Sequence, residues 1–490
     1  MPAQTTQRIT TGLPGLDEIL NGGLLSQKAY LIQGDPGTGK STLGYHFLRQ
    51  GLDNDEKVLY ITLGERKPMI LQNASQIGLD LSDVIFADLT PNENLYKENN
   101  SYSIFSPQEV ERDPIISTIV ETVETHQPSR IFLDSITMLK LLNNDPFQMR
   151  RMALSFINYI CGKGATLLIT SEIGADNNLI DQNANFWVDG VIRLEYSPGW
   201  RKISVSKFRG SNFIGGNHSF KITSNGMRIF PRLQPKKYGR EYISDPISSG
   251  IEKLDNILYG GIEKGTITMI TGPSGVGKTN LSIQFIKEAA QRDERSVIYT
   301  FEESREMIIE RSESINVPIR SIMKSGNLTI EPIEPFSYSS DEFTAIVRKE
   351  VEENNTRFVM LDSIGGYSLS VKEENKLERL HGLTVYLQNM GVTAFLINET
   401  NSITGDFQAS EMQASYLTDN ILFLRYIELR GELRKAIGIL KKRMSDFNPA
   451  IYEFAITSDG IQIGQKYNNV SGILTGIAKR LDPAPDNLEK

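Results

Sequence analysis

The stretch Thr268-Met-Ile-Thr-Gly-Pro-Ser-Gly-Val-Gly-Lys-Thr279 decides the fold of this chain. An apolar, β-branched strand leads into a glycine loop, and a helical run from Asn280 to Ala290 follows the loop. The spacing G-x-x-x-x-G-K-T is typical of a P-loop, in which backbone N–H groups and a helix N-terminus converge on phosphate groups. The stretch therefore predicts an ATP-binding loop made of Gly272, Gly275, Val276, Gly277, Lys278, Thr279 and Asn280.

The same pattern occurs a second time, nearer the N-terminus. Leu16-Asp17 and Leu254-Asp255 stand in two similar segments and lie 238 positions apart. Glu65 and Glu303 are separated by the same offset, and so are the two glycine loops. A fixed offset across three motifs indicates an internal duplication. The earlier loop is therefore predicted to bind ATP as well, through Gly34, Gly37, Thr38, Gly39, Lys40, Ser41 and Thr42.

Both copies continue with short apolar strands between helical patterns. This alternation predicts an α/β fold, in which each copy has a mostly parallel sheet with helices on both faces. We expect a first P-loop domain over residues 1–233 and a second over residues 249–472. The polar segment 234–248, which carries Pro and Gly, is expected to be a linker, and residues 473–490 a mobile tail without periodicity.

Composition argues against several classes of protein. The 490 residues carry a formal net charge of −8, which does not suit a surface built mainly to bind nucleic acid. Cys161 is the only cysteine, so an intramolecular disulfide and cysteine-rich metal sites are impossible. Residues 1–9 lack the apolar core of a signal peptide, and no apolar run is long enough to span a membrane. A cytoplasmic protein without a membrane partner is expected.

Acidic residues at strand ends are expected to serve the phosphates. Asp134 and Asp362 each end an apolar strand, which is the form of a Walker B acid. A Walker B acid helps to bind Mg²⁺, and the loop hydroxyls of Ser41 and Thr279 are suited to the same ion. These four residues and Glu302 are the predicted Mg²⁺ ligands, with Asp362 acting through water.

A further acidic pair distinguishes the two copies. Glu302 and Glu303 follow a buried-type strand, and such a pair can divide two duties, one carboxylate on Mg²⁺ and one as catalytic base. Acids are also favoured at a helix N-terminus for purely structural reasons. In the first copy Gly64 stands where Glu302 stands, so Glu65 is the only acid of the pair. ATP binding is expected there, with slower hydrolysis than in a domain that holds both acids.

A K-x-R pair follows a strand near the end of each copy. Lys207 and Arg209 match Lys441 and Arg443 in order, although the offset has drifted from 238. Such pairs are often solvated surface charges. Because their place repeats, we predict that they contact the ATP of a neighbouring subunit, where added cations neutralise the transferring phosphate.

Together these motifs resemble the circadian-clock ATPase family KaiC. The G-x-x-x-L-D…G-G motif of each copy, the sequence Phe301-Glu-Glu-Ser304 and the K-x-R pairs carry the resemblance, which covers Ile9 to Gly472. The segment Leu417–Glu432 is the most specific, because it looks like the region just after the family's phosphorylated hydroxyl residues. The resemblance implies two tandem RecA-like P-loop ATPase domains, the second an autokinase. It also implies a double-ring homohexamer with ATP at the subunit boundaries.

The resemblance also implies sites of modification. Ser415 matches the family's phosphoserine, and Tyr416 stands where the family has Thr or Ser. We expect Ser415 to be the principal acceptor and Tyr416 to be weakly modified or unmodified. The tail after Gly472 is short and does not match the family's KaiA-binding tail, so KaiA is not expected as a partner. A KaiB-like protein or another signalling protein is expected as a partner instead.

Two other functions stay open at this stage beside a KaiC-like timer or stress-signalling hub. A RecA- or RadA-like DNA-dependent ATPase would share the P-loops, but the acidic balance counts against it. A weakly hydrolysing ATP-binding scaffold is supported mainly by Gly64.

Overall fold

The chain divides into two compact units in a computed structural model. Its described residues are 7–90, 107–136, 146–172, 185–197, 199–240, 245–371, 375–400, 414–429, 431–468, 470–473 and 479–480. Unit 1 is Met1–Arg232 and unit 2 is Leu233–Lys490. Most of the predicted tail, 473–490, lies outside the described residues. No helix of the described residues is long and apolar enough to cross a membrane.

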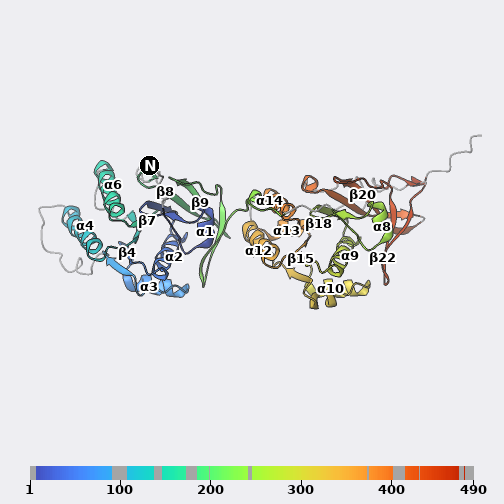
Figure 1. The fold of residues 1–490 in the computed structure, drawn as a ribbon, viewed down its shortest axis with the longest axis horizontal. Helices are drawn as coiled ribbons and strands as arrows, with labels where there is room; N and C mark the ends of the chain where they lie inside the picture. The colour runs from blue at the N-terminus through green and yellow to red at the C-terminus, as the bar shows by residue number, and fades with distance from the viewer. Residues whose placement is uncertain are drawn as a thin grey trace, which may run out of the picture. The chain divides into compact units, whose positions relative to one another are not determined.

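Unit 1 alternates strands and helices before ending in antiparallel strands (Figure 1). In chain order its elements are β1 (Arg8–Ile9), α1 (Pro14–Ile19), β2 (Leu24–Leu25), β3 (Ala29–Gln33), α2 (Lys40–Asp53), β4 (Val58–Thr62), α3 (Lys67–Gln76), β5 (Ile85–Asp88), α4 (Pro107–His126), β6 (Arg130–Asp134), α6 (Pro146–Gly162), β7 (Thr166–Ser171), β8 (Gly190–Ser197), β9 (Trp200–Phe208), β10 (His218–Thr223) and β11 (Gly226–Phe230).

Unit 2 repeats this order with additional short helices. Its elements are η2 (Pro235–Lys237), β12 (Pro246–Ile247), α8 (Glu252–Ile257), β13 (Ile262–Glu263), β14 (Ile267–Gly272), α9 (Lys278–Gln291), β15 (Ser296–Thr300), α10 (Arg305–Ser314), α11 (Ile319–Lys324), β16 (Leu328–Pro332), α12 (Ser340–Glu353), β17 (Phe358–Asp362), α13 (Ile364–Ser370), α14 (Lys376–Asn389), β18 (Thr393–Glu399), η3 (Ala414–Leu417), β19 (Asn420–Leu429), β20 (Glu432–Lys442), β21 (Tyr452–Thr457), β22 (Gly460–Lys466), β23 (Val470–Ser471) and β24 (Lys479–Arg480).

The described part of each unit contains a nine-stranded sheet with the same strand order. In unit 1 the order is β11-β10-β9-β8-β3-β7-β6-β4-β5, and in unit 2 it is β22-β21-β20-β19-β14-β18-β17-β15-β16. The strands from β8 to β5 run parallel, and β9, β10 and β11 continue the sheet antiparallel. The predicted α/β fold with two mostly parallel sheets is therefore confirmed.

Each sheet separates two hydrophobic cores. In β3, Tyr30 and Ile32 belong to the core that includes α1, α2 and α3, whereas Ala29 and Leu31 belong to the core that includes α4 and α6. Successive side chains of a strand point to opposite faces, so a fully apolar strand supplies both cores. Unit 2 has the same arrangement, with α8, α9, α10 and α11 on one face and α12, α13 and α14 on the other.

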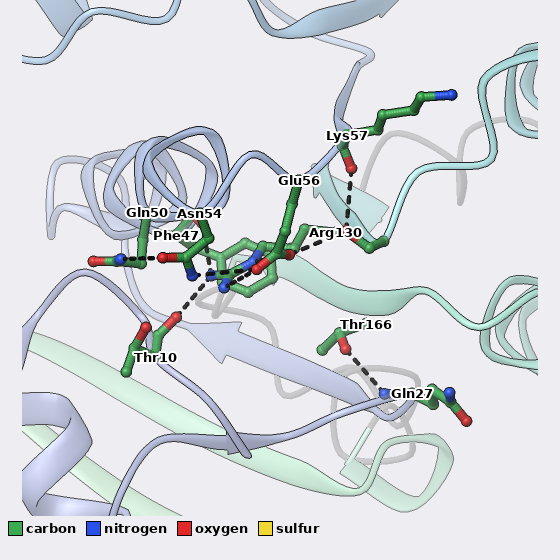
Figure 2. Close-up of polar contacts among 10 residues, drawn as sticks. Thr10, Gln27, Phe47, Gln50, Asn54, Glu56, Lys57, Arg130 and Thr166 are labelled. Atoms are coloured by element: carbon green, nitrogen blue, oxygen red, sulfur yellow. Dashed lines mark hydrogen bonds and ion pairs between the residues drawn. The ribbon is translucent and has the colours of Figure 1, made fainter. Parts of the chain in front are cut away.

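A buried ion pair links three distant segments of unit 1. The fully buried Arg130, at the start of β6, donates from Nε and Nη2 to the two carboxylate oxygens of Glu56 at 2.7 and 2.8 Å (Figure 2). Its Nη1 donates to the carbonyl oxygens of Thr10 and Phe47 at 2.7 and 3.2 Å. The guanidinium thus joins the N-terminal segment to α2, the helix that begins at the first P-loop, and to the segment that follows it.

The ion pair determines the ionisation of Glu56. Burial alone would raise the pKa of this carboxyl group. Hydrogen bonds and charge from Arg130, together with hydrogen bonds from Asn54 and Ser129, outweigh burial and lower the pKa below its usual value. Glu56 is therefore held as an anion opposite a permanently charged guanidinium.

The segment expected to be a linker contacts helix α14 of unit 2. The Arg240 backbone N–H donates to the Asn389 carbonyl oxygen at 2.8 Å, and Asn389 Nδ2 donates to the Pro235 carbonyl oxygen at 2.9 Å. The Tyr238 ring packs edge-on against Tyr386, with 5.1 Å between ring centroids. Residues 235–240 thus pack on the second unit.

Candidate functional site

The second P-loop lies between a buried strand and a helix. Every residue of β14 is buried, and α9 begins directly after Gly277. Gly277 has φ +117, and a Cβ there would approach Ile456 Cδ1 to 2.4 Å, so only glycine fits without strain. Lys278 follows at the helix start and donates from Nζ to the Pro273 carbonyl oxygen at 2.8 Å. The lysine side chain therefore folds back over the loop that is expected to bind the phosphates of ATP.

A cavity of about 270 Å³ opens over this loop. Its walls combine the P-loop with both acids after β15, the acid at the end of β17 and a cation from α10. The lining residues are Ser274, Gly275, Gly277, Lys278, Thr279, Asn280, Glu302, Glu303, Arg311, Asp362, Ser363, Ile397 and Glu399. The structure thus brings most residues predicted for the second site into one cavity.

The hydroxyl and the Walker B acid predicted to bind Mg²⁺ are in contact. Thr279 Oγ1 donates to Asp362 Oδ2 at 2.8 Å. Burial raises the pKa of Asp362 to about 6, with Glu303 adding to the rise, while Thr279, Arg311 and Lys278 oppose it. A buried carboxylate beside a hydroxyl is an oxygen donor set of the kind that Mg²⁺ prefers when phosphates complete its coordination.

Lys278 experiences two opposing influences. Burial lowers the pKa of its ammonium group, and the nearby carboxylates, first Glu399 and then Asp362, raise it. The Nζ atom lies 3.8 Å from Glu399 Oε2. Sequence reasoning missed Glu399, which ends β18 next to the P-loop strand. A strand that ends in an acid beside the P-loop was the available signal.

The two acids after β15 have different partners. Ser363 Oγ donates to Glu302 Oε1 at 2.8 Å, from the residue that follows the Walker B acid. Arg311 Nη1 donates to Glu303 Oε1 at 2.6 Å from the last turn of α10. Sequence reasoning also missed Arg311, because its contact with Glu303 depends on how α10 folds back towards that acid.

The first site repeats the hydroxyl–acid contact. Ser41 Oγ donates to Asp134 Oδ2 at 2.7 Å, and the same carboxylate accepts hydrogen bonds from Tyr60 at 3.1 Å and Thr170 at 2.6 Å. Lys40 Nζ donates to the Gly34 carbonyl oxygen at 2.8 Å. Burial lowers the pKa of Lys40, and Glu172, Asp134 and Asp35 oppose this effect. The residues present therefore fit Mg²⁺ at both sites.

The described residues contain no cluster of side chains that could hold a metal ion by itself. No cluster of three or more His, Cys, Asp or Glu side chains occurs there. A Mg²⁺ ion at either site would therefore depend on a few oxygen ligands of the protein together with phosphate and water.

The lone acid of the first site is held by a neutral partner. Asn73 Nδ2 donates to Glu65 Oε1 at 2.6 Å. Burial raises the pKa of Glu65, Asp134 adds to the rise, and Asn73 lowers it. A Cβ added at Gly64 would meet no described atom within 4 Å, so lack of space does not account for the missing second acid.

Two cations that sequence reasoning missed contact the P-loops within each chain. Arg201 Nη1 donates to the Gly37 carbonyl oxygen at 2.8 Å, and Lys435 Nζ donates to the Gly275 carbonyl oxygen at 3.3 Å. Both come from the strand after the last parallel strand, at equivalent places of the two sheets. Extending the internal alignment to β9 and β20 would have found them.

The K-x-R lysines are held at the ends of their own strands. Lys207 Nζ donates to the carbonyl oxygens of Asn185 and Val188 at 2.6 and 2.7 Å. Lys441 Nζ donates to those of Ser415 and Thr418 at 3.0 and 2.5 Å. Burial lowers the pKa of both lysines.

The arginines of the K-x-R pairs contact residues of their own units. Arg443 Nη1 lies 3.5 Å from Asp419 Oδ1. The Arg209 backbone N–H donates to the Asp189 carbonyl oxygen at 2.8 Å. Neither Lys441 nor Arg443 is among the described residues that line the cavity of unit 2.

The two candidate acceptors lie in the short helix η3. Ser415 is half-buried, and its carbonyl oxygen accepts from Lys441 and from Thr418 Oγ1. The Tyr416 side chain is 49% exposed, and its ring lies against His381 with 5.7 Å between centroids. Ser415 is not among the described residues that line the cavity of its own chain.

Comparisons with known proteins cover nearly the whole chain. A family model described as "ATPase: KaiC" matches residues 9–234 and 247–468. A "Circadian clock oscillator protein KaiC" from Parasynechococcus marenigrum is 27% identical over 488 residues, which is 97% of this chain and 94% of that protein. Proteins of the same name from Picosynechococcus sp. and Thermostichus vulcanus are 28% and 27% identical, and each match covers 97% of this chain and 93% or 92% of the relative.

Proposed function

The chain belongs to the KaiC family of ATPases, and on this premise we propose that it is an ATP-hydrolysing serine/threonine autokinase that forms a double-ring homohexamer. Membership of the family carries ATP binding and ATPase activity of the clock type. It also confirms the resemblance inferred from the sequence motifs. The observation that carries the autokinase proposal is the cavity of unit 2, where Lys278, Asp362 and Glu303 meet.

The first step of the proposed reaction is the binding of ATP with Mg²⁺. Lys278 holds the outer phosphates, and the N–H groups of the P-loop surround them. Thr279, Asp362 and Glu302 would hold Mg²⁺, which supplies positive charge on the phosphate oxygens. Ser41 and Asp134 would have this role in unit 1. The residues of the chain thereby fix the γ-phosphate before any bond changes.

The second step transfers the γ-phosphoryl group. Glu303 accepts the proton of the Ser415 hydroxyl as the Ser415 oxygen forms a bond to the γ-phosphorus. The bond between that phosphorus and the bridging oxygen breaks, and ADP leaves with the electron pair. In unit 1 a water molecule replaces the serine and Glu65 accepts its proton. Because Ser415 does not line its own cavity, we propose that transfer occurs between neighbouring subunits.

The phosphate acceptor provides the direct test of the autokinase. After incubation of the full chain with ATP and Mg²⁺, we expect one phosphate, carried mainly by Ser415. The Tyr416 hydroxyl projects several ångströms farther on a rigid ring, so one position of η3 cannot present both acceptors for in-line attack at about 3–3.5 Å. Intact-mass and peptide-mapping spectrometry measure this, with Lys278→Ala as the unphosphorylated control.

The Ser415→Ala variant decides between the two acceptors. It should lose nearly all of the phosphate, whereas Tyr416→Phe should keep it. Undiminished phosphate in Ser415→Ala, or phosphate mainly on Tyr416, would show that the assignment is wrong.

Assembly is the second test. We expect ATP with Mg²⁺ to produce a particle of six 54.9 kDa chains, because the K-x-R cations need the phosphates of a neighbour. Light scattering with and without nucleotide measures the mass. Lys40→Ala should reduce assembly more than Lys278→Ala, if the first ring is the one that assembles on ATP. A stable nucleotide-loaded monomer would contradict the hexamer, and equal effects of the two variants would contradict the assignment of roles.

The wider role follows from the same family assignment. The curated relatives are named circadian clock oscillator proteins. We propose that this chain acts as a cytoplasmic timer or stress-signalling hub and that a KaiB-like protein or another signalling protein binds it. The match of both halves to the KaiC model favours this role over that of a DNA-dependent recombinase.

A further inference from the structure

The two catalytic acids have partners at equivalent positions. Asn73 lies eight residues after Glu65, and Arg311 lies eight residues after Glu303. Both partners come from the helix that follows the acid, and both donate to its Oε1 atom at 2.6 Å. The duplication has therefore kept the contact and changed its chemistry from a neutral amide to a guanidinium.

The remaining anchors of the two acids are alike. The backbone N–H of Glu65 donates to Thr62 Oγ1 at 3.3 Å, and that of Glu303 donates to Thr300 Oγ1 at 3.2 Å. In both units the same threonine hydroxyl donates back to the carbonyl oxygen of the acid. The side-chain partner is thus the main difference between the two carboxylates, apart from Glu302.

The charge of Arg311 acts directly on a proton acceptor. Glu303 Oε2 is buried and has no hydrogen-bond partner among the described residues, so it is the oxygen open to a proton, while Arg311 occupies Oε1. The charge-assisted hydrogen bond to Arg311 holds the carboxylate of Glu303 in place, so Glu303 has to weaken this bond before it can move towards an attacking hydroxyl group. Asn73 holds Glu65 less strongly, because a neutral amide bonds an anion less strongly than a guanidinium does.

We propose that Arg311 is a positioning residue that restrains Glu303 through an ion pair and thereby slows phosphoryl transfer in the second unit. The inference rests on the proposed function, because it takes Glu303 as the base. Its consequence is that one residue of α10 sets the rate of the second site independently of the first, since the neutral Asn73 stands at the equivalent position beside Glu65.

Reciprocal exchange of the two partners tests the proposal in the full chain. Glu65→Gln silences the first unit, and Arg311→Asn in that background is expected to raise ATP turnover and the rate of Ser415 phosphorylation about three- to tenfold. The KM for ATP should change less than about twofold, because the ion pair is made to Glu303 rather than to the nucleotide. A rise in rate cannot come from misfolding.

The opposite exchange should have the opposite effect. In a Glu303→Gln background, Asn73→Arg is expected to lower the turnover of the first unit by a similar factor. Arg311→Lys should restore most of the restraint in the second unit. Arg320→Asn is the matched control, because it removes an exposed ion pair with Glu313 at 3.0 Å on the neighbouring helix, and it should leave the rates unchanged.

The outcomes separate this inference from the proposed function. No turnover and no phosphate in the Glu65→Gln background would overturn the autokinase itself and the inference with it. Turnover that Arg311→Asn leaves unchanged or lowers would overturn the inference alone. A fall in rate together with a raised KM would instead assign the free Arg311 donors, Nε and Nη2, to the phosphates.

Discussion

Replacing Glu303 with Gln is expected to lower phosphoryl transfer in the second unit by a factor of about 10²–10⁴. The amide keeps the size of the side chain but cannot accept the proton of the attacking hydroxyl. ATP binding should persist, because the P-loop and the Thr279–Asp362 contact at 2.8 Å do not involve Glu303. The rate of Ser415 phosphorylation in the full chain, measured at saturating ATP, gives the factor.

A neighbouring acid provides the control for this substitution. Glu306 lies in the first turn of the same helix, α10, and is exposed. Glu306→Gln makes the same chemical change outside the cavity and should leave the rate as it is. If Glu303→Gln kept more than about a tenth of the rate, Glu303 would not be the base, and Glu302 would take its place in the mechanism.

The largest effect on stability is expected from Glu56→Ala in unit 1. The variant leaves the fully buried guanidinium of Arg130 without its carboxylate. Breaking a buried ion pair from one side costs about 3–5 kcal/mol, and we expect about 3 kcal/mol because Glu56 itself is partly exposed. Both tryptophans, Trp187 and Trp200, lie in unit 1, so their fluorescence during urea unfolding reports this unit alone.

A surface pair serves as the comparison. Asp53→Ala removes the partner of Arg49 at 2.5 Å on α2, where both side chains are exposed enough for water to compete. Such pairs contribute about 0–1 kcal/mol, so the unfolding midpoint should move little. Equal shifts of the unfolding midpoint in the two variants would show that the Arg130–Glu56 ion pair stabilises unit 1 no more than a surface pair does.

At acidic pH the wild type should lose its greater stability over the Glu56→Ala variant. The pKa of Glu56 is lowered in the folded protein, so its contribution is complete above the pKa of the unfolded chain. It is lost as the pH falls through the lowered folded value. The difference in stability between wild type and Glu56→Ala should therefore be constant near neutral pH and shrink in this acidic range.

Local patterns were enough to predict the fold and the motifs of both sites. The P-loop spacing, the fixed offset and the strand-ending acids each involve residues close together in the chain, and the ends of neighbouring parallel strands meet at one edge of a sheet. The α/β class and the family resemblance inferred from them are confirmed. The contact of Thr279 with Asp362 follows from that topology.

Partners that depend on side-chain direction could not be predicted in this way. Arg130 reaches Thr10, Phe47 and Glu56 because of how α2 packs on β6, and no spacing in the sequence encodes that. Arg311 reaches Glu303 across two turns of chain for the same reason. Such contacts depend on packing geometry, which short-range patterns do not record.

The division of each unit into two cores has a consequence for how the protein can change over evolution. Tyr30 and Leu31 are neighbours in the chain but face different cores, and the P-loop helix α2 packs in only one of them. Substitutions without shared contacts combine additively, so changes in the core of α4 and α6 can accumulate with little effect on α2.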